Sequence, residues 1–150
     1  MYTRRSWREK MDNPNLPKVV DIPRNWQKWC GPGSMVIPSP RQVDALIRAV
    51  PKGRLITVKQ IREILAAEHM ARIACPLTTG IFVRIAAEAA EEDAQAGRTR
   101  ITPYWRVVKE DGSLNPKFPG GVRRQAERLR AEGHRIVPAK GKQPPRVAAA

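Results

Sequence analysis

The stretch from residue 103 to residue 133 reads PYWRVVKEDGSLNPKFPGGVRRQAERLRAEG, and it decides the fold. Its apolar start, Trp105 to Lys109, predicts a short strand. The Asp111-Gly112 pair that follows is a strong signal of a β-hairpin turn. Gly120-Gly121 then predicts a hinge ahead of a helix. Gly133 suits the position just after that helix, because glycine readily adopts the left-handed conformation that ends many helices.

Three helices are predicted upstream from capping signals and apolar spacing. Ser39 offers an N-cap oxygen for the first helix. Thr57 caps a second helix, with Gln60 three residues on as its partner in a capping box. A third helix, the recognition helix, is expected to begin at Thr78 or Thr79 after a connection over 70–77. Two helices joined in this way and followed by a hairpin are typical of a winged helix-turn-helix domain, so we predict a mostly α fold with a small β-hairpin.

The chain divides into three regions by composition. Residues 1–37 form an extension rich in tryptophan, proline and basic residues, in which 35–37 are expected to be either a short strand or an apolar lead-in to the first helix. Residues 38–137 hold the predicted winged helix domain, and residues 138–150 form a basic tail that we expect to be disordered. The tryptophans of the extension either stack on nucleic-acid bases or pin the extension onto the domain surface, and they are Trp7, Trp26 and Trp29.

A net charge of +14 and a pI near 10.9 are the strongest features of the composition. Such an excess favours polyanionic partners, of which nucleic acid is the commonest. It also exceeds the charge of about 2 to 8 that is typical of a soluble small domain. We therefore predict double-stranded DNA as the partner, and the alternative is a basic surface kept for solubility.

The sequence shows no sign of a membrane segment or of a bound metal. No apolar run reaches the roughly 18 residues that a membrane helix needs, and no apolar segment follows the basic N-terminus as in a signal peptide. Two cysteines make no disulfide framework. We expect a monomer in the cytoplasm, associated with the nucleoid. His69 and His134 lack partners at metal-ligand spacing, so we expect no metal and no cofactor.

The stretch from 103 to 133 also resembles the C-terminal half of the alkylguanine-DNA alkyltransferases. That family carries Pro-Cys-His-Arg-Val-Val, a hairpin ending in Gly-x-Leu, an aromatic residue, a Gly-Gly pair and a helix ending in Glu-Gly. Upstream, Val50 to Thr57 is similar to the Ile-Pro-x-Gly-x-Val-Thr segment that leads into its helix-turn-helix, so the resemblance covers residues 38–137. The matching residues downstream are Pro103, Arg106-Val107-Val108, Gly112-Ser113-Leu114, Phe118, Gly120-Gly121 and Glu132-Gly133.

The departure from the family lies at the reactive pair. Tyr104-Trp105 stands where the family has Cys-His. Alkyl transfer needs a thiolate activated by a neighbouring base, and a phenol with an ordinary pKa near 10 is a poor nucleophile at neutral pH. The resemblance therefore implies the scaffold without the chemistry. It points to the alkyltransferase-like branch, which lacks the cysteine and binds damaged DNA without repairing it. Glu132 aligns with the carboxylate that orients the family's His, and we interpret it as a helix-end acid.

The expected DNA contacts follow from this resemblance and from the basic residues. On the recognition helix they are Thr78, Thr79 and Arg84, although an ion pair with Glu88 is an alternative role for Arg84. Elsewhere they are Arg98, Arg100, Arg123, Arg124 and Arg128. Three further residues are expected to line the former alkyl pocket and to hold a base there: Tyr104, Trp105 and Arg106. Other repair proteins are potential partners.

Two other functions remain open from the sequence. The first is a protein-interaction module, in which the pocket is closed, Trp105 packs in the core and the N-terminal tryptophans bind a partner. The second is a cysteine alkyltransferase that uses Cys75, because a thiol near a helix start can have a lowered pKa. A buried, inert Cys75 is the alternative to that role. We expect no enzyme, because the family's reactive pair is absent.

Overall fold

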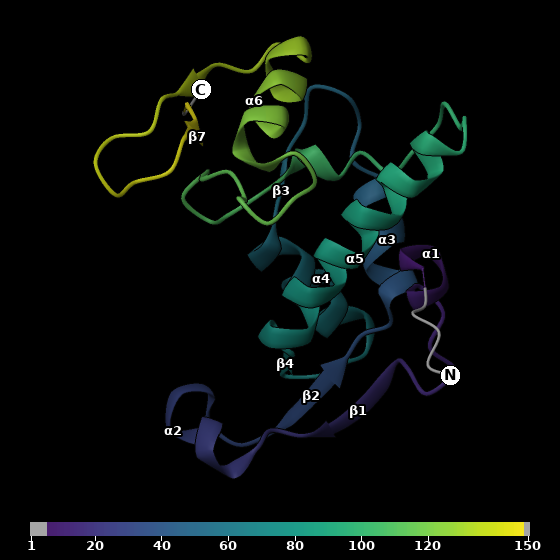
Figure 1. The fold of residues 1–150 in the computed structure, drawn as a ribbon. Coiled ribbons are helices and arrows are strands. Elements are labelled where there is room, and N and C mark those ends of the chain that lie inside the picture. The colour runs from purple at the N-terminus through teal and green to yellow at the C-terminus, as the bar shows by residue number, and fades with distance from the viewer. Residues whose placement is uncertain (1–5, 149–150) are drawn as a thin grey trace, which may run out of the picture.

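The computed structural model describes residues 6–148, which form a mixed α/β protein with 45% helix (Figure 1). Residues 1–5 of the predicted extension and residues 149–150 of the predicted tail lie outside the described part. Six α-helices lie within residues 6–148: α1 (Trp7–Lys10), α2 (Gln27–Cys30), α3 (Pro40–Arg48), α4 (Val58–Glu68), α5 (Pro76–Gln95) and α6 (Gly121–Ala131). Two 3-10 turns accompany them, η1 (Arg24–Trp26) and η2 (Tyr104–Arg106). The strands are β1 (Lys18–Asp21), β2 (Ser34–Ile37), β3 (Ile56–Thr57), β4 (Ile73–Ala74), β5 (Val107–Val108), β6 (Ile136–Val137) and β7 (Arg146–Val147).

The predicted helix starts are confirmed for α3 and α4. The Ser39 hydroxyl accepts the Gln42 N–H, and the Gln42 side chain returns the bond to the Ser39 N–H. Thr57 and Gln60 form the same reciprocal pair at the start of α4. Both pairs satisfy backbone groups that a helix leaves free at its first turn. α5 begins at Pro76, two residues before the predicted start, since proline is suited to the first helical position.

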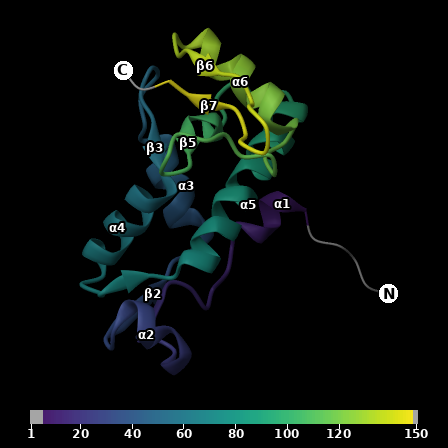
Figure 2. The ribbon, with the colours of Figure 1, turned by 90° about the vertical axis from the view of Figure 1, so that its left-hand side faces the viewer.

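α5 is the longest helix, and it lies at the centre of the molecule (Figure 2). α1, α3 and α4 pack against it. Its buried face is rich in alanine, and small side chains let neighbouring helices approach closely. One core cluster joins α3, α4 and α5 to η2 and α6, and among its most deeply buried side chains are Ile47, Leu65, Val83, Tyr104 and Leu129.

Strands from the first 37 residues share a sheet with the connection between α4 and α5. β1 pairs antiparallel with β2, which confirms the strand alternative for 35–37. β2 pairs in parallel with β4, so a strand lies inside the connection over 70–77. Trp26 packs on the small core cluster beneath this sheet, whereas Trp29 is 73% exposed. Trp26 thus fits the pinning role, and Trp29 does not.

The predicted β-hairpin at Asp111-Gly112 is not formed, although its turn is present. The Gly112 N–H donates to the Lys109 carbonyl at 2.8 Å, and the Lys109 N–H donates to the Ser113 carbonyl at 3.0 Å. In the described part of the chain, no strand ladder extends from this turn, because β5 pairs in parallel with β3. Trp105 lies in η2 instead of in a strand. Consecutive strand residues face opposite sides, whereas a 3-10 turn allows the adjacent Tyr104 and Trp105 rings both to enter the core, where they are 1% and 9% exposed.

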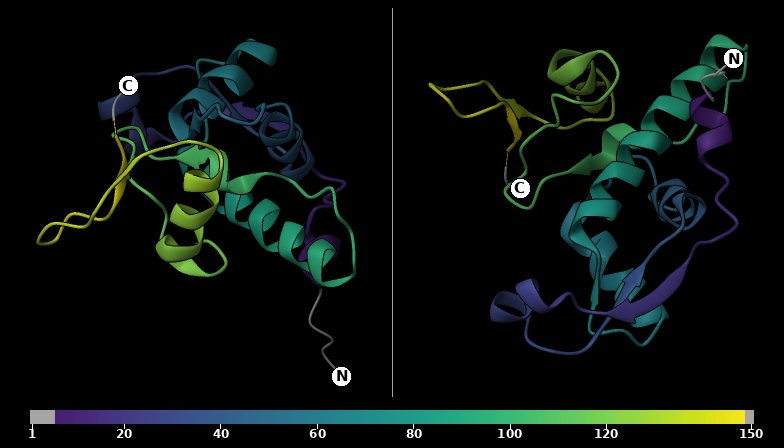
Figure 3. Two further views of the ribbon diagram at one scale, coloured as in Figure 1. Left: turned by 90° about the horizontal axis from the view of Figure 1, so that it is seen from above. Right: turned by 60° about the horizontal axis from the view of Figure 1, so that its bottom comes forward.

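The tail also differs from the expectation of disorder. β6 and β7 pair antiparallel, with Ile136 opposite Val147, and the resulting hairpin lies beside α6 (Figure 3). The Val147 N–H donates to the Gly112 carbonyl at 2.9 Å, and the Leu114 N–H donates to the Pro145 carbonyl at 2.9 Å. The turn at Asp111-Gly112 offers these backbone groups, so residues 138–148 find partners that composition alone does not reveal.

Within residues 6–148, every helix is too short or too polar to cross a bilayer.

Candidate nucleic-acid interface

A groove of about 770 Å³ runs along the first half of α5. Its other walls are the start of α4, the loop over 109–117 and α1. One acid, Glu110, lines it. Six basic residues line it as well, namely Lys10, Lys59, Arg62, Arg84, Lys109 and Lys117. This excess of positive charge in a concave surface is suited to a polyanion.

The pairing of β3 with β5 brings the two basic walls of the groove together. Thr57 lies opposite Val108, so the start of α4 lies beside the loop that follows β5. The Lys59 ammonium consequently meets the Glu110 carboxylate at 3.1 Å. Both side chains are more than half exposed, so this pair contributes little to stability and leaves Lys59 available to an incoming phosphate.

A buried amide fixes the loop over 109–117. Gln125, on α6, is 1% exposed, and its side-chain oxygen accepts the Asn115 N–H at 2.8 Å. Its NH₂ group donates to the Trp105 and Val107 carbonyls at 3.2 and 2.9 Å. The Asn115 side chain in turn accepts the Lys117 N–H at 2.9 Å. The backbone that carries Lys117 is therefore held by the core.

Two apolar side chains of α5 project at the groove. Leu77 and Ile81 are one helical turn apart and are 64% and 49% exposed. Exposed large apolar residues within a basic surface are suited to contact with bases or sugars, because phosphates are bound by the cations around them.

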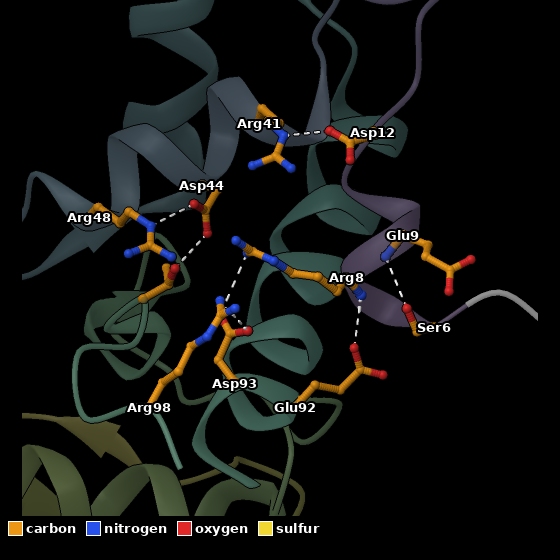
Figure 4. A network of polar contacts seen from close by, with 11 residues as sticks. Ser6, Arg8, Glu9, Asp12, Arg41, Asp44, Arg48, Glu92, Asp93 and Arg98 are labelled. Carbon is orange, nitrogen blue, oxygen red and sulfur yellow. Dashed lines mark hydrogen bonds and ion pairs between the residues drawn. The ribbon is translucent and has the colours of Figure 1, made fainter. Parts of the chain in front are cut away.

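Trp7 ties α1 to the edge of the groove. The Lys10 ammonium lies 4.0 Å from the centre of the Trp7 ring, and the Arg84 guanidinium lies 5.6 Å from it. The Trp7 and Arg8 N–H groups donate to the Glu92 carboxylate at 3.0 and 2.9 Å, and Figure 4 shows the Arg8 end of this contact. Trp7 therefore pins the extension onto α5 and also lines the groove.

Arg84 is the only residue of the expected DNA-contact set that lines this groove. Its guanidinium is 3.9 Å from the Glu88 carboxylate, so the expected alternative, an ion pair one turn along, is present as well. Thr79 is fully buried, and its hydroxyl donates to the Cys75 carbonyl at 2.7 Å. The Thr78 hydroxyl is buried without a hydrogen-bond partner among residues 6–148. Neither threonine hydroxyl is presented to a ligand.

A second cavity, of about 560 Å³, gathers five of the other predicted site residues. It lies where the C-terminal ends of α3 and α5 meet the segment over 98–106 and α6. The predicted residues that line it are Arg98, Arg100, Trp105, Arg106 and Arg128, and the structure adds Arg48 from α3. We refer to it as the arginine cavity. The last two predicted contacts lie elsewhere on α6, where Arg123 is paired with Glu127 at 3.5 Å and Arg124 with Glu91 at 3.7 Å.

Glu132 is a buried partner of the arginine cavity rather than a free helix-end acid, which corrects the sequence-based interpretation. Its carboxylate accepts the Trp105 indole N–H at 3.0 Å and lies 2.7 Å from the Arg106 guanidinium. Burial alone would raise the pKa of Glu132, but these donors and the Arg106 charge outweigh burial and hold it below its ordinary value. Glu132 is therefore ionised at neutral pH.

Tyr104 lies in the core and lines neither cavity. Its ring makes edge-to-face contacts with Trp105 and Phe118, with centroids 5.4 and 5.3 Å apart. Its hydroxyl donates to the Glu91 carboxylate at 2.7 Å. Burial, together with this bond to an anion, raises the pKa of Tyr104 above its ordinary value. The phenol is protonated at neutral pH and is no nucleophile.

Replacing Tyr104 by phenylalanine is expected to lower the free energy of unfolding by about 1 kcal/mol, the usual loss for one buried hydrogen bond. The loss stays small because Glu91 keeps Arg124 and Arg128 as partners. Urea denaturation at pH 7 measures it. A loss above about 3 kcal/mol would mean that the hydroxyl holds more than this one bond.

The two cysteines differ in exposure. Cys75 is 4% exposed, as the inert alternative predicts, and Cys30 is half-buried. In the part of the chain from 6 to 148, no three His, Cys, Asp or Glu side chains gather closely enough to hold a metal ion.

Sequence reasoning missed most of the groove, since it named Arg84 alone of the six cations. Lys109 and Lys117 flank the Asp111-Gly112 turn, and a basic residue on each side of a predicted wing was a usable signal. Lys10, Lys59 and Arg62 carry no such signal, because their approach to α5 depends on tertiary packing.

Comparison with protein-family models, with curated proteins and with solved structures finds no match to this chain.

Proposed function

We propose that this chain is a non-catalytic DNA-binding protein with a winged helix-turn-helix domain, similar to the alkyltransferase-like proteins. In this proposal α4 and α5 are the two helices of the motif, and the loop over 109–117 takes the place of the wing. It acts as a monomer in the cytoplasm, on nucleoid DNA, and it senses alkylated DNA for other repair proteins.

The observation that carries the proposal is the groove along α5, with six basic residues against one acid. Arg62, Lys109 and Lys117 are in no ion pair within the described residues, so their charges are available to phosphates. The buried, protonated Tyr104 supports a role without alkyl transfer. Residues from three helices and one loop meet in the groove, which suits the backbone of a duplex that crosses several elements.

A protein-interaction module is the second candidate. It is supported by Tyr104, which at 1% exposure cannot line an open base pocket. Trp29 is 73% exposed and supports it too, because a large exposed aromatic side chain is a common anchor in protein interfaces.

Duplex binding by fluorescence anisotropy at several salt concentrations tests the proposal. We expect binding that weakens steeply with salt, because contacts to about four to six phosphates give a log–log slope of roughly −4 to −5. The double variant Lys109→Glu, Lys117→Glu should bind at least about tenfold more weakly and with a shallower slope. Its matched control is Arg130→Glu, Arg135→Glu, which changes the same charge at exposed positions outside the groove.

Each outcome of this experiment has a defined meaning. Absence of binding near physiological salt, or an equal loss in the control variant, rejects the DNA proposal and favours the interaction module. A second duplex that carries one alkylated guanine tests damage sensing. A preference of about tenfold, roughly 1.4 kcal/mol, supports it, and equal binding restricts the role to general DNA binding.

A further inference from the structure

We propose that the arginine cavity binds the phosphate monoester group of a nucleotide-sized ligand, at a site separate from the groove. No acidic residue lines the cavity, whereas five arginines do: Arg48, Arg98, Arg100, Arg106 and Arg128. Arginine is suited to this ligand, because its planar fork of N–H donors matches two phosphate oxygens at once.

Carboxylates outside the cavity lining hold four of the arginines in place. Arg48 donates to Asp44 at 2.7 Å, Arg98 to Asp93 at 3.2 Å and Arg106 to Glu132 at 2.7 Å. Arg128 donates to Glu91 at 3.0 Å, and its guanidinium also lies 4.3 Å from the centre of the Trp105 ring. Figure 4 shows Arg48 on α3 and Arg98 in the loop after α5, each beside its acid. The guanidinium groups are thus positioned before a ligand arrives, which reduces the entropy lost on binding.

Donors remain after these bonds are made. In the described residues, Arg48, Arg98 and Arg128 each use one guanidinium nitrogen in a hydrogen bond. Arg106 is the exception, because it also donates to the Val50 carbonyl and its three nitrogens are all engaged. Arg106 therefore shapes the cavity, and the other three arginines supply free N–H groups to an anion.

Arg100 gives the cavity a cation that no acid neutralises. It is exposed, and it forms no ion pair with any residue between 6 and 148. The four acids that hold the other arginines leave its charge uncompensated, and an anion is attracted most strongly to such a charge. Arg100 is consequently the residue whose removal tests the site with the least effect on folding.

The size and the remaining wall of the cavity indicate what accompanies the phosphate. A volume of about 560 Å³ lies within the range of roughly 300 to 1,000 Å³ that holds drug-sized ligands, and so exceeds the need of a single phosphate. The cavity is also lined by Ala94, Ile101, Pro103 and Trp105, which add apolar atoms beside the arginines. A phosphate joined to an apolar or aromatic body, as in a mononucleotide, matches both surfaces.

Two sources present this chemistry, a free nucleotide and the 5′-phosphorylated end of a DNA strand. Isothermal titration calorimetry with adenosine monophosphate, and with adenosine as the matched ligand without phosphate, tests the first. Anisotropy with a duplex that carries either a 5′-phosphate or a 5′-hydroxyl tests the second. Both use the full chain.

We expect saturable binding of one phosphate-bearing ligand per chain, at least about tenfold tighter than its partner without phosphate. Arg100→Ala should weaken it about tenfold, Arg48→Ala should weaken it as well, and Arg130→Ala, an exposed arginine outside the cavity, should leave it unchanged. If the mononucleotide binds, the source is a free nucleotide. If only the duplex shows a preference for 5′-phosphate that depends on Arg100, the source is a DNA end.

Either of two results overturns the site. One is that neither ligand pair shows a dependence on phosphate. The other is that Arg130→Ala weakens binding as much as Arg100→Ala, since the effect is then general charge. The groove variant Lys109→Glu, Lys117→Glu separates this inference from the proposed function. It should lose duplex affinity and keep full affinity for the mononucleotide, and a loss of both would place the phosphate in the groove.

Discussion

Replacing Glu132 by glutamine is expected to lower the free energy of unfolding by about 3 kcal/mol at pH 7, because it leaves the Arg106 guanidinium buried without its anion. The two side chains are 13% and 8% exposed and lie 2.7 Å apart. Glutamine keeps an oxygen that accepts the Trp105 indole N–H. The loss of unfolding free energy therefore reports mainly on the removal of the Glu132 negative charge. Urea denaturation measures it.

The same variant should show a distinct dependence on pH. The pKa of Glu132 is held below its ordinary value of 4.5 in the folded state. As the pH falls through 4.5, the unfolded chain therefore takes up this proton before the folded chain does, and the stabilisation is lost as the pH falls further through the folded pKa. The variant has no such proton to bind. The difference in stability between the two proteins should be full near pH 7 and should shrink steadily below about pH 4.5.

A control for this prediction lies on the same helix. Glu127 pairs with Arg123 at 3.5 Å, and both side chains are exposed, at 59% and 89%. Glu127→Gln removes the same charge from a solvated pair and should cost less than about 0.5 kcal/mol. Equal losses in the two variants, or a Glu132→Gln loss that does not change with pH, would contradict the role given to the buried pair.

Replacing Gln125 by leucine is expected to cost about 3 kcal/mol or more, although the two side chains are similar in size. The amide of Gln125 holds the part-buried Asn115 N–H and the buried Trp105 and Val107 carbonyls. Leucine offers none of these bonds, and each buried backbone group left without a partner costs roughly 1 to 3 kcal/mol. Thermal and urea denaturation both measure the loss.

A functional effect should accompany this loss of stability. Asn115 also accepts the Lys117 N–H, so a loosened loop no longer holds Lys117 over the groove. We expect weaker duplex binding even at temperatures where the variant is fully folded. Gln95→Leu is the control, because Gln95 is exposed at the end of α5 and its replacement should be nearly neutral. Unchanged stability in Gln125→Leu would mean that water replaces the amide.

The helices were predictable because their signals are local. Ser39 and Thr57 each have their capping partner three residues on, and these starts were found to the residue. The β-hairpin prediction failed for the opposite reason. Asp111-Gly112 does form a turn, but the partner of β5 is β3, which lies about 50 residues earlier in the sequence. A turn motif predicts where the chain reverses direction, but it does not predict which distant strand will pair with the strand before the turn.

The candidate site was harder to predict, because ion pairing decides which arginines are free. The acids at the end of α5 are unfavourable for that helix, since they oppose its dipole. In the structure they have partners outside the helix: Glu91 binds Tyr104, Arg124 and Arg128, and Asp93 binds Arg8 and Arg98. Arg100 has none. Sequence reasoning named the Arg84–Glu88 contact alone, although the same spacing of one helical turn also pairs Arg48 with Asp44 and Arg123 with Glu127.

The parallel contact of β2 with β4 has a consequence for how the chain acquires its fold. The β1–β2 hairpin uses neighbouring residues, so it can form as soon as residue 37 has left the ribosome. β4 lies nearly 40 residues later, at the point where α4 turns back toward α5. The earlier hairpin can thus act as a template that sets the angle between the two helices. Until β4 arrives, the free edge of β2 is open to strands of other chains, which makes this interval the aggregation-sensitive step of synthesis.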